Sequence, residues 1–73
     1  MPQNNIGPLI KMANSIAENL RHDGISDQAV AEKIANHIRK FWTRSMKSEI
    51  SSYVNNGGSD LNRDVCNAIK FLA

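Results

Sequence analysis

The sequence predicts an all-α protein, a small single-domain bundle of about four helices. Apolar residues recur at three- and four-residue spacing in four segments, and no segment shows sustained period-two alternation rich in β-branched residues. Short connections between these segments contain residues that are favoured at helix caps and turns. With 73 residues, the chain is long enough for one domain only.

The first helix is expected from about Pro8 to His22. Proline suits the first turn of a helix, because an N–H there would have no intrahelical partner. The apolar stripe of this helix consists of Leu9, Met12, Ala13, Ile16, Ala17 and Leu20. The residues before Ile6 are polar and show no hydrophobic period. We therefore expect a flexible N-terminal segment over residues 1–7 and the helical domain over residues 8–73.

The second helix is expected from about Asp27 to Phe41. Asp23 and Gly24 form a turn signal, and Ser26 follows as the N-cap, whose hydroxyl can accept a backbone N–H. The apolar stripe consists of Val30, Ala31, Ile34, Ala35, Ile38, Phe41 and Trp42.

The third helix is expected from about Arg44 to Asn55, with Thr43 as its N-cap. The pair Gly57 and Gly58 supplies the left-handed conformation that often ends a helix. Asn62 is the expected N-cap of a short fourth helix. The stripe of that helix consists of Val65, Ala68, Ile69 and Leu72.

Composition excludes several classes of protein. Cys66 is the only cysteine, so neither an intramolecular disulfide nor a cluster of thiolates for zinc can form. The chain shows neither a signal-peptide pattern nor the roughly eighteen consecutive apolar residues of a membrane span. We expect a cytoplasmic protein without a membrane partner. The formal charge of +2 is too weak to indicate a polyanionic partner unless the cations are clustered.

No catalytic, cofactor-binding or metal-binding residues are predicted. His22 and His37 each lack neighbouring ligands at the spacing of a zinc site, and a small bundle has little room for a pocket that excludes water. Cys66 is expected in the first turn of the fourth helix, at a position that predicts a buried, inert side chain.

Residues 37–47 form the most unusual segment, because four cations surround the only tryptophan. Three interpretations remain open. Phe41 and Trp42 can fill the core while the cations complement helix ends and face solvent. The same residues can anchor a protein partner, since Trp and Arg are enriched at interface hot spots. The cations can also contact phosphates, with the second and third helices acting as a DNA-binding helix-turn-helix, although Glu49 and the scarcity of base-reading side chains argue against it.

Three segments resemble the delta subunit of NAD-dependent formate dehydrogenases. They are residues 11–17 (Lys-Met-Ala-Asn-Ser-Ile-Ala), residues 37–42 (His-Ile-Arg-Lys-Phe-Trp) with Met46 beyond them, and residues 57–61 (Gly-Gly-Ser-Asp-Leu). Their order and spacing agree with the family from about Leu9 to Leu72. The chain departs from the family where Asp-Pro steps are usual, at residues 43–44 and 62–63. An N-cap is kept at both places, so the fold is expected to survive.

The resemblance implies a non-catalytic accessory subunit of a cytoplasmic molybdenum or tungsten formate dehydrogenase. This chain would bind the large molybdopterin-containing subunit and support its assembly or stability, with no cofactor of its own. The partner subunits would carry molybdopterin, iron–sulfur clusters, FMN and NAD. The expected partner-binding residues are Arg39, Lys40, Phe41, Trp42, Arg44 and Asn14. For Asn14 the alternative role is a hydrogen bond between helices.

Two other functions remain as alternatives. One is a small helical DNA-binding regulator that uses the basic patch around Trp42. The other is a homo-oligomeric helical protein without a larger partner. Salt separates phosphate-driven binding from an apolar protein interface, because only the former weakens steeply as salt rises.

Overall fold

The computed structural model describes residues 6–72 and consists of the helices α1 (Ile6–Leu20), α2 (Asp27–Phe41), α3 (Arg44–Asn55) and α4 (Arg63–Leu72). Among these residues there is no strand, so the all-α prediction is confirmed.

The helix bounds agree closely with the sequence-based expectations. α2 and α3 have the expected bounds, whereas α1 begins and ends two residues earlier than expected. Ile6 and Gly7 belong to the first turn of α1, although both fell within the expected flexible segment. The rest of that segment, residues 1–5, lies outside the described residues, as does residue 73.

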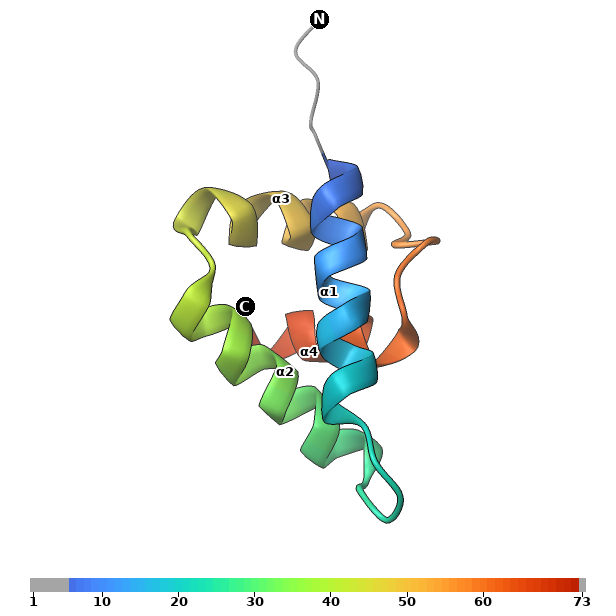
Figure 1. Cartoon of the computed structure of the whole chain (residues 1–73). Helices are drawn as coiled ribbons and strands as arrows, with labels where there is room; N and C mark the ends of the chain where they lie inside the picture. The colour runs from blue at the N-terminus through green and yellow to red at the C-terminus, as the bar shows by residue number, and fades with distance from the viewer. Residues whose placement is uncertain (1–5, 73) are drawn as a thin grey trace, which may run out of the picture.

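The four helices surround one core. α4 packs chiefly against α2, and α1 contacts each of the other three helices. Figure 1 shows α1 in front, with α3 near its N-terminal end, α2 near its C-terminal end and α4 behind it. Among the largest fully buried side chains are Ile34 and Ile38 of α2, Ile50 of α3 and Val65 of α4. Ala31 and Ala35 of α2 and Ala68 of α4 are buried as well, and such small side chains let packed helices approach closely.

Three of the helices begin at the caps that the sequence predicts. Ser26 Oγ accepts a hydrogen bond from the backbone N–H of Ala29 at 3.0 Å, and Thr43 Oγ1 accepts one from Met46 at 3.2 Å. Asn62 Oδ1 accepts one from the N–H of Asp64 at 2.8 Å. Each bond satisfies an N–H that has no partner within its own helix, so these local signals set where α2, α3 and α4 start.

Gly57 and Gly58 end α3 as predicted. Their φ angles are 124° and 58°, a region that favours glycine. The N–H of Gly58 bonds to the carbonyl of Tyr53 at 3.0 Å, and the N–H of Gly57 bonds to that of Val54 at 3.0 Å. This pair of bonds is the Schellman pattern of helix ends. Gly58 is buried, and a Cβ at this position would lie 3.3 Å from the sulfur of Cys66.

Candidate functional site

Phe41 and Trp42, two adjacent predicted partner contacts, have opposite environments. Trp42 is 6% exposed and belongs to the core, whereas Phe41 is 70% exposed. The Phe41 ring lies 4.8 Å from the imidazole of His37, centroid to centroid. The chain leaves the helical conformation at Trp42, whose ψ of 145° is extended. Of the three interpretations left open by the sequence, the one in which both aromatic residues fill the core is therefore wrong for Phe41 and right for Trp42.

A groove lies between α1 and the end of α2, and Phe41 and Trp42 both line it. Its volume is about 590 Å³. Met12 of α1 is 44% exposed there. The lining residues, here named the apolar groove, are Pro8, Lys11, Met12, Ser15, Ile16, His37, Phe41, Trp42 and Met46. Within the described part of the chain, this lining contains one lysine and no carboxylate.

The predicted cations lie outside the apolar groove. Arg39 and Arg44 line a separate hollow of about 300 Å³ together with Lys47, Ser48, Ser51 and Leu72, here named the basic hollow. Arg39 donates a hydrogen bond to Asn36 Oδ1 at 2.9 Å and another to the carbonyl of Phe71 at 3.0 Å. Its guanidinium thus satisfies a carbonyl in the last turn of α4. Lys40 is exposed and lines neither the groove nor the hollow.

Asn14 links α1 to the loop that precedes α4. Its side-chain Nδ2 donates to the carbonyl of Asp60 at 3.1 Å, and its Oδ1 accepts from the backbone N–H of Asn62 at 2.7 Å. Both polar atoms of the amide are therefore engaged within the domain. The interaction resembles the alternative role expected for Asn14, although it joins a helix to a loop and not to another helix.

The ion pair of Arg21 and Asp64 is absent from the sequence-based expectations. The two side chains form two hydrogen bonds, of 2.6 and 2.9 Å, and Arg21 also donates to Asp27 at 2.7 Å. Hydrogen bonding to Asp64, and secondarily to Asp27, raises the pKa of Arg21, and hydrogen bonding from Arg21 lowers the pKa of Asp64. One signal was present in the sequence: Asp64 lies four residues before Ala68, on the apolar stripe of α4.

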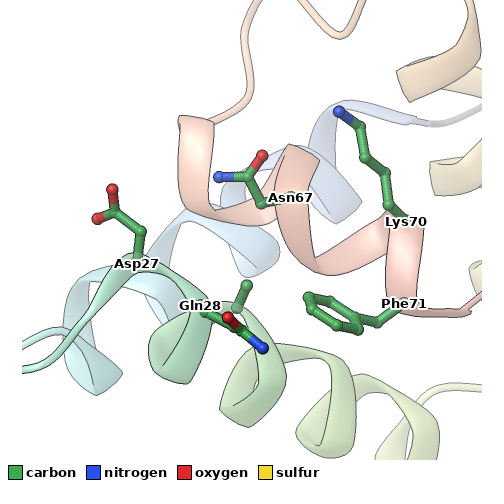
Figure 2. Close-up of a pocket in the computed structure, with 6 residues that line it drawn as sticks. Asp27, Gln28, Asn67, Lys70 and Phe71 are labelled. Carbon is green, nitrogen blue, oxygen red and sulfur yellow. The ribbon is translucent and has the colours of Figure 1, made fainter.

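A third hollow lies between α2 and α4, and Figure 2 shows its lining. Its volume is about 370 Å³. Phe71 lies beside α2, while Asp27 and Lys70 lie at opposite ends of the view. Asp27 is already paired with Arg21 at 2.7 Å and lies 3.7 Å from Arg63. The lining thus mixes an aromatic ring with amides and both signs of charge, unlike the apolar groove.

Neither histidine belongs to a metal site in the described region. Nδ1 of His22 lies 3.0 Å from the carbonyl of Asp23, and His37 contacts Phe41. Across residues 6–72, no three His, Cys, Asp or Glu side chains are grouped so that they could hold a metal ion. Over the same residues, no helix has the length and apolar character needed to cross a membrane.

Comparison with known proteins identifies the family. The family described as "NADH-dependant formate dehydrogenase delta subunit FdsD" matches residues 8–69. Comparisons with curated proteins and with solved structures gave no match. The family match includes α2 and α3 completely and most of α1 and α4. It therefore confirms the resemblance found in the sequence, and the chain belongs to the family of formate dehydrogenase delta subunits.

Proposed function

We propose that this protein is a non-catalytic accessory subunit that binds the large, molybdopterin-containing subunit of a cytoplasmic NAD-dependent formate dehydrogenase. Binding would support the assembly or the stability of that subunit. The chain itself would hold no cofactor, and molybdopterin, iron–sulfur clusters, FMN and NAD would belong to the partner subunits. The family match over residues 8–69 is the observation that carries the proposal.

The surface of the domain supports a binding role. A phenylalanine that is 70% exposed at a helix end leaves most of its apolar ring in water. Single exposed apolar residues are common, but here Met12, also exposed, lies in the same groove. Covering such a groove with apolar groups of another protein is favourable, because it removes apolar surface from water.

The size of the domain supports the same role. A chain of this length supplies a core worth only about 3–5 kcal/mol. A partner that binds the folded form and not the unfolded chain raises the apparent stability by mass action. The proposed complex would thus stabilise this subunit as well as its partner.

The experiment that tests the proposal is co-purification from cells that contain the formate dehydrogenase. The protein is tagged, recovered, and washed at low and at moderate salt, and bound proteins are identified by mass spectrometry. We expect the large subunit to be recovered with the tagged protein and to stay bound at moderate salt. In cells that lack this chain, we expect less large subunit to be recovered in the assembled enzyme.

Two other outcomes would contradict the proposal. Salt-sensitive recovery of nucleic acid without the dehydrogenase would favour the DNA-binding regulator, since phosphate contacts weaken steeply with salt. The basic hollow, with its three cations, would then be the surface to test. Recovery of the chain by itself, as a defined oligomer, would favour the homo-oligomer.

A further inference from the structure

We infer that the apolar groove is the docking site for the large subunit, and that the segment it accepts is apolar and carries a carboxylate that pairs with Lys11. This inference rests on the proposed function and names the part of the surface that performs it. The sequence-based expectation shares Phe41 and Trp42 with this inference, but it assigned the charged contacts to Arg39, Lys40 and Arg44 and not to Lys11.

The first argument is where apolar surface remains exposed. Trp42 is 6% exposed, so its indole has little surface left for a partner, whereas Phe41 is 70% exposed and Met12 is 44% exposed. Both exposed side chains line the apolar groove, one from each wall. Phe71, at 44%, is the other large exposed apolar residue among residues 6–72, and it lies by the α2–α4 hollow. The groove is therefore where two of these three side chains can be covered by one partner.

The second argument is the shape of the groove. Its volume of about 590 Å³ is larger than that of the α2–α4 hollow or of the basic hollow. α1 forms one wall, and the end of α2 with Met46 of α3 forms the other. A space of this size between two helices accepts several apolar side chains of one partner segment. Trp42 also lines the groove, although its side chain belongs to the core.

The third argument is charge. Lys11 lines the groove, no Asp or Glu does, and no ion pair within the described residues involves Lys11. A carboxylate on the incoming segment would complement this ammonium group. A second copy of the same face would bring no carboxylate to Lys11, because the groove lining contains no Asp or Glu and a two-fold contact uses the same surface of both copies. The groove is therefore suited to a different protein with an acidic group.

The test uses the purified protein and the purified large subunit, with four variants. Phe41→Ser removes the exposed ring, and Phe71→Ser is the matched control on α4. Lys11→Glu reverses the charge at the groove, and Lys33→Glu is the matched control on an exposed site of α2 that lines none of the three hollows. Circular dichroism checks that every variant is folded.

We expect Phe41→Ser to raise the Kd by about tenfold or more, since an anchor side chain carries a large part of the binding energy. Lys11→Glu should raise it by roughly three- to tenfold, with the larger effect at low salt. Both control variants should stay within about twofold of the unaltered protein. Equal Kd values for Phe41→Ser and Phe71→Ser would overturn the docking site.

A carbodiimide cross-link tests the carboxylate directly, because this reagent joins a lysine amine to a carboxylate in contact with it. We expect a cross-linked peptide between Lys11 and an Asp or Glu of the large subunit. Lys11→Arg should bind normally and lose this peptide, because the charge is kept while the amine is removed. A complex that forms with full affinity and gives cross-links only from other lysines would overturn the inference and leave the proposed function intact. Failure of the unaltered protein to bind the large subunit would overturn both.

Discussion

The guanidinium of Arg21 donates two hydrogen bonds to the carboxylate of Asp64, which lies 43 residues away in the sequence. Nε donates to Oδ2 at 2.6 Å, and Nη2 donates to Oδ1 at 2.9 Å. The Asp64 side chain is 5% exposed and that of Arg21 is 38% exposed. The pair fastens the end of α1 to the first turn of α4, so a helix that packs chiefly on α2 is also fixed to α1.

Removing the charge of Asp64 should destabilise the fold. Asp64→Asn removes the negative charge and one of the two acceptor oxygens, so Arg21 keeps a charged partner only in Asp27. We expect the free energy of unfolding to fall by about 1–3 kcal/mol, measured by urea denaturation. Asp27→Asn is the control, because Asp27 is exposed and an exposed ion pair is worth only about 0.2–1 kcal/mol. Equal losses for the two variants would contradict the special role of the pair with the buried Asp64.

Low pH should lower the free energy of unfolding through the Asp64 carboxylate. The pKa of Asp64 is below its ordinary value of 3.8, chiefly because Arg21 donates hydrogen bonds to it. The unfolded chain therefore binds a proton at a higher pH than the folded chain does. This contribution to stability is complete above the ordinary value and is lost as the pH falls through the lowered one. Denaturation from pH 7 to pH 2 should show a smaller decline for Asp64→Asn than for the unaltered protein; the same decline in both would exclude Asp64 as a cause.

The Asn14 side chain should contribute to the stability of the fold. Asn14→Ala removes the acceptor of the Asn62 N–H and the donor to the Asp60 carbonyl. We expect a loss of about 1–2 kcal/mol in the free energy of unfolding, since one of the two bonds is partly buried. Asn14→Asp should restore part of this loss, because a carboxylate oxygen can still accept from Asn62. An Asn14→Ala variant of normal stability that no longer bound the large subunit would instead support its expected role as a partner contact.

The neighbouring aromatic residues should respond very differently to truncation. Trp42→Ala should cost about 3–5 kcal/mol, as large as the whole stability expected for such a domain, and should leave the chain largely unfolded. Phe41→Ala should change the stability by no more than about 0.5 kcal/mol, because the ring is mostly in solvent. Thermal melts followed by circular dichroism measure both. Similar melting temperatures for the two variants would contradict their assigned environments.

Gly58 should not tolerate a side chain. Its φ of 58° strains an L-residue, and the added Cβ would lie 3.3 Å from Cys66 Sγ and 3.4 Å from the Cα of Val54. We expect Gly58→Ala to lower the free energy of unfolding by about 1–2 kcal/mol. Gly7→Ala is the matched control, since Gly7 is helical and a Cβ added there would meet nothing within 4 Å. That variant should be neutral or slightly stabilising, as alanine favours helices, and a similar loss at both glycines would contradict the close packing of Gly58.

The sequence by itself determined the local structure. The side chains of Ser26, Thr43 and Asn62 accept hydrogen bonds from backbone N–H groups two or three residues later. The N–H groups of the glycine pair donate to carbonyls of the preceding turn. Because these interactions are completed within a few residues, their pattern predicts helix bounds directly. The family could be predicted too, since its motifs are short segments whose order and spacing can be compared without a structure.

Only the tertiary structure decided which surfaces are free. The pairing of Arg21 with Asp64 and the bonds of Asn14 to the loop at residues 60–62 join segments more than 40 residues apart. No local pattern specifies such contacts. Likewise, periodicity assigned Phe41 and Trp42 to one stripe, but the assembled structure buries Trp42 and leaves Phe41 mostly exposed. The position of a side chain at a helix end depends on how the chain continues and on which helix packs against it, and that is fixed only when all four helices are assembled.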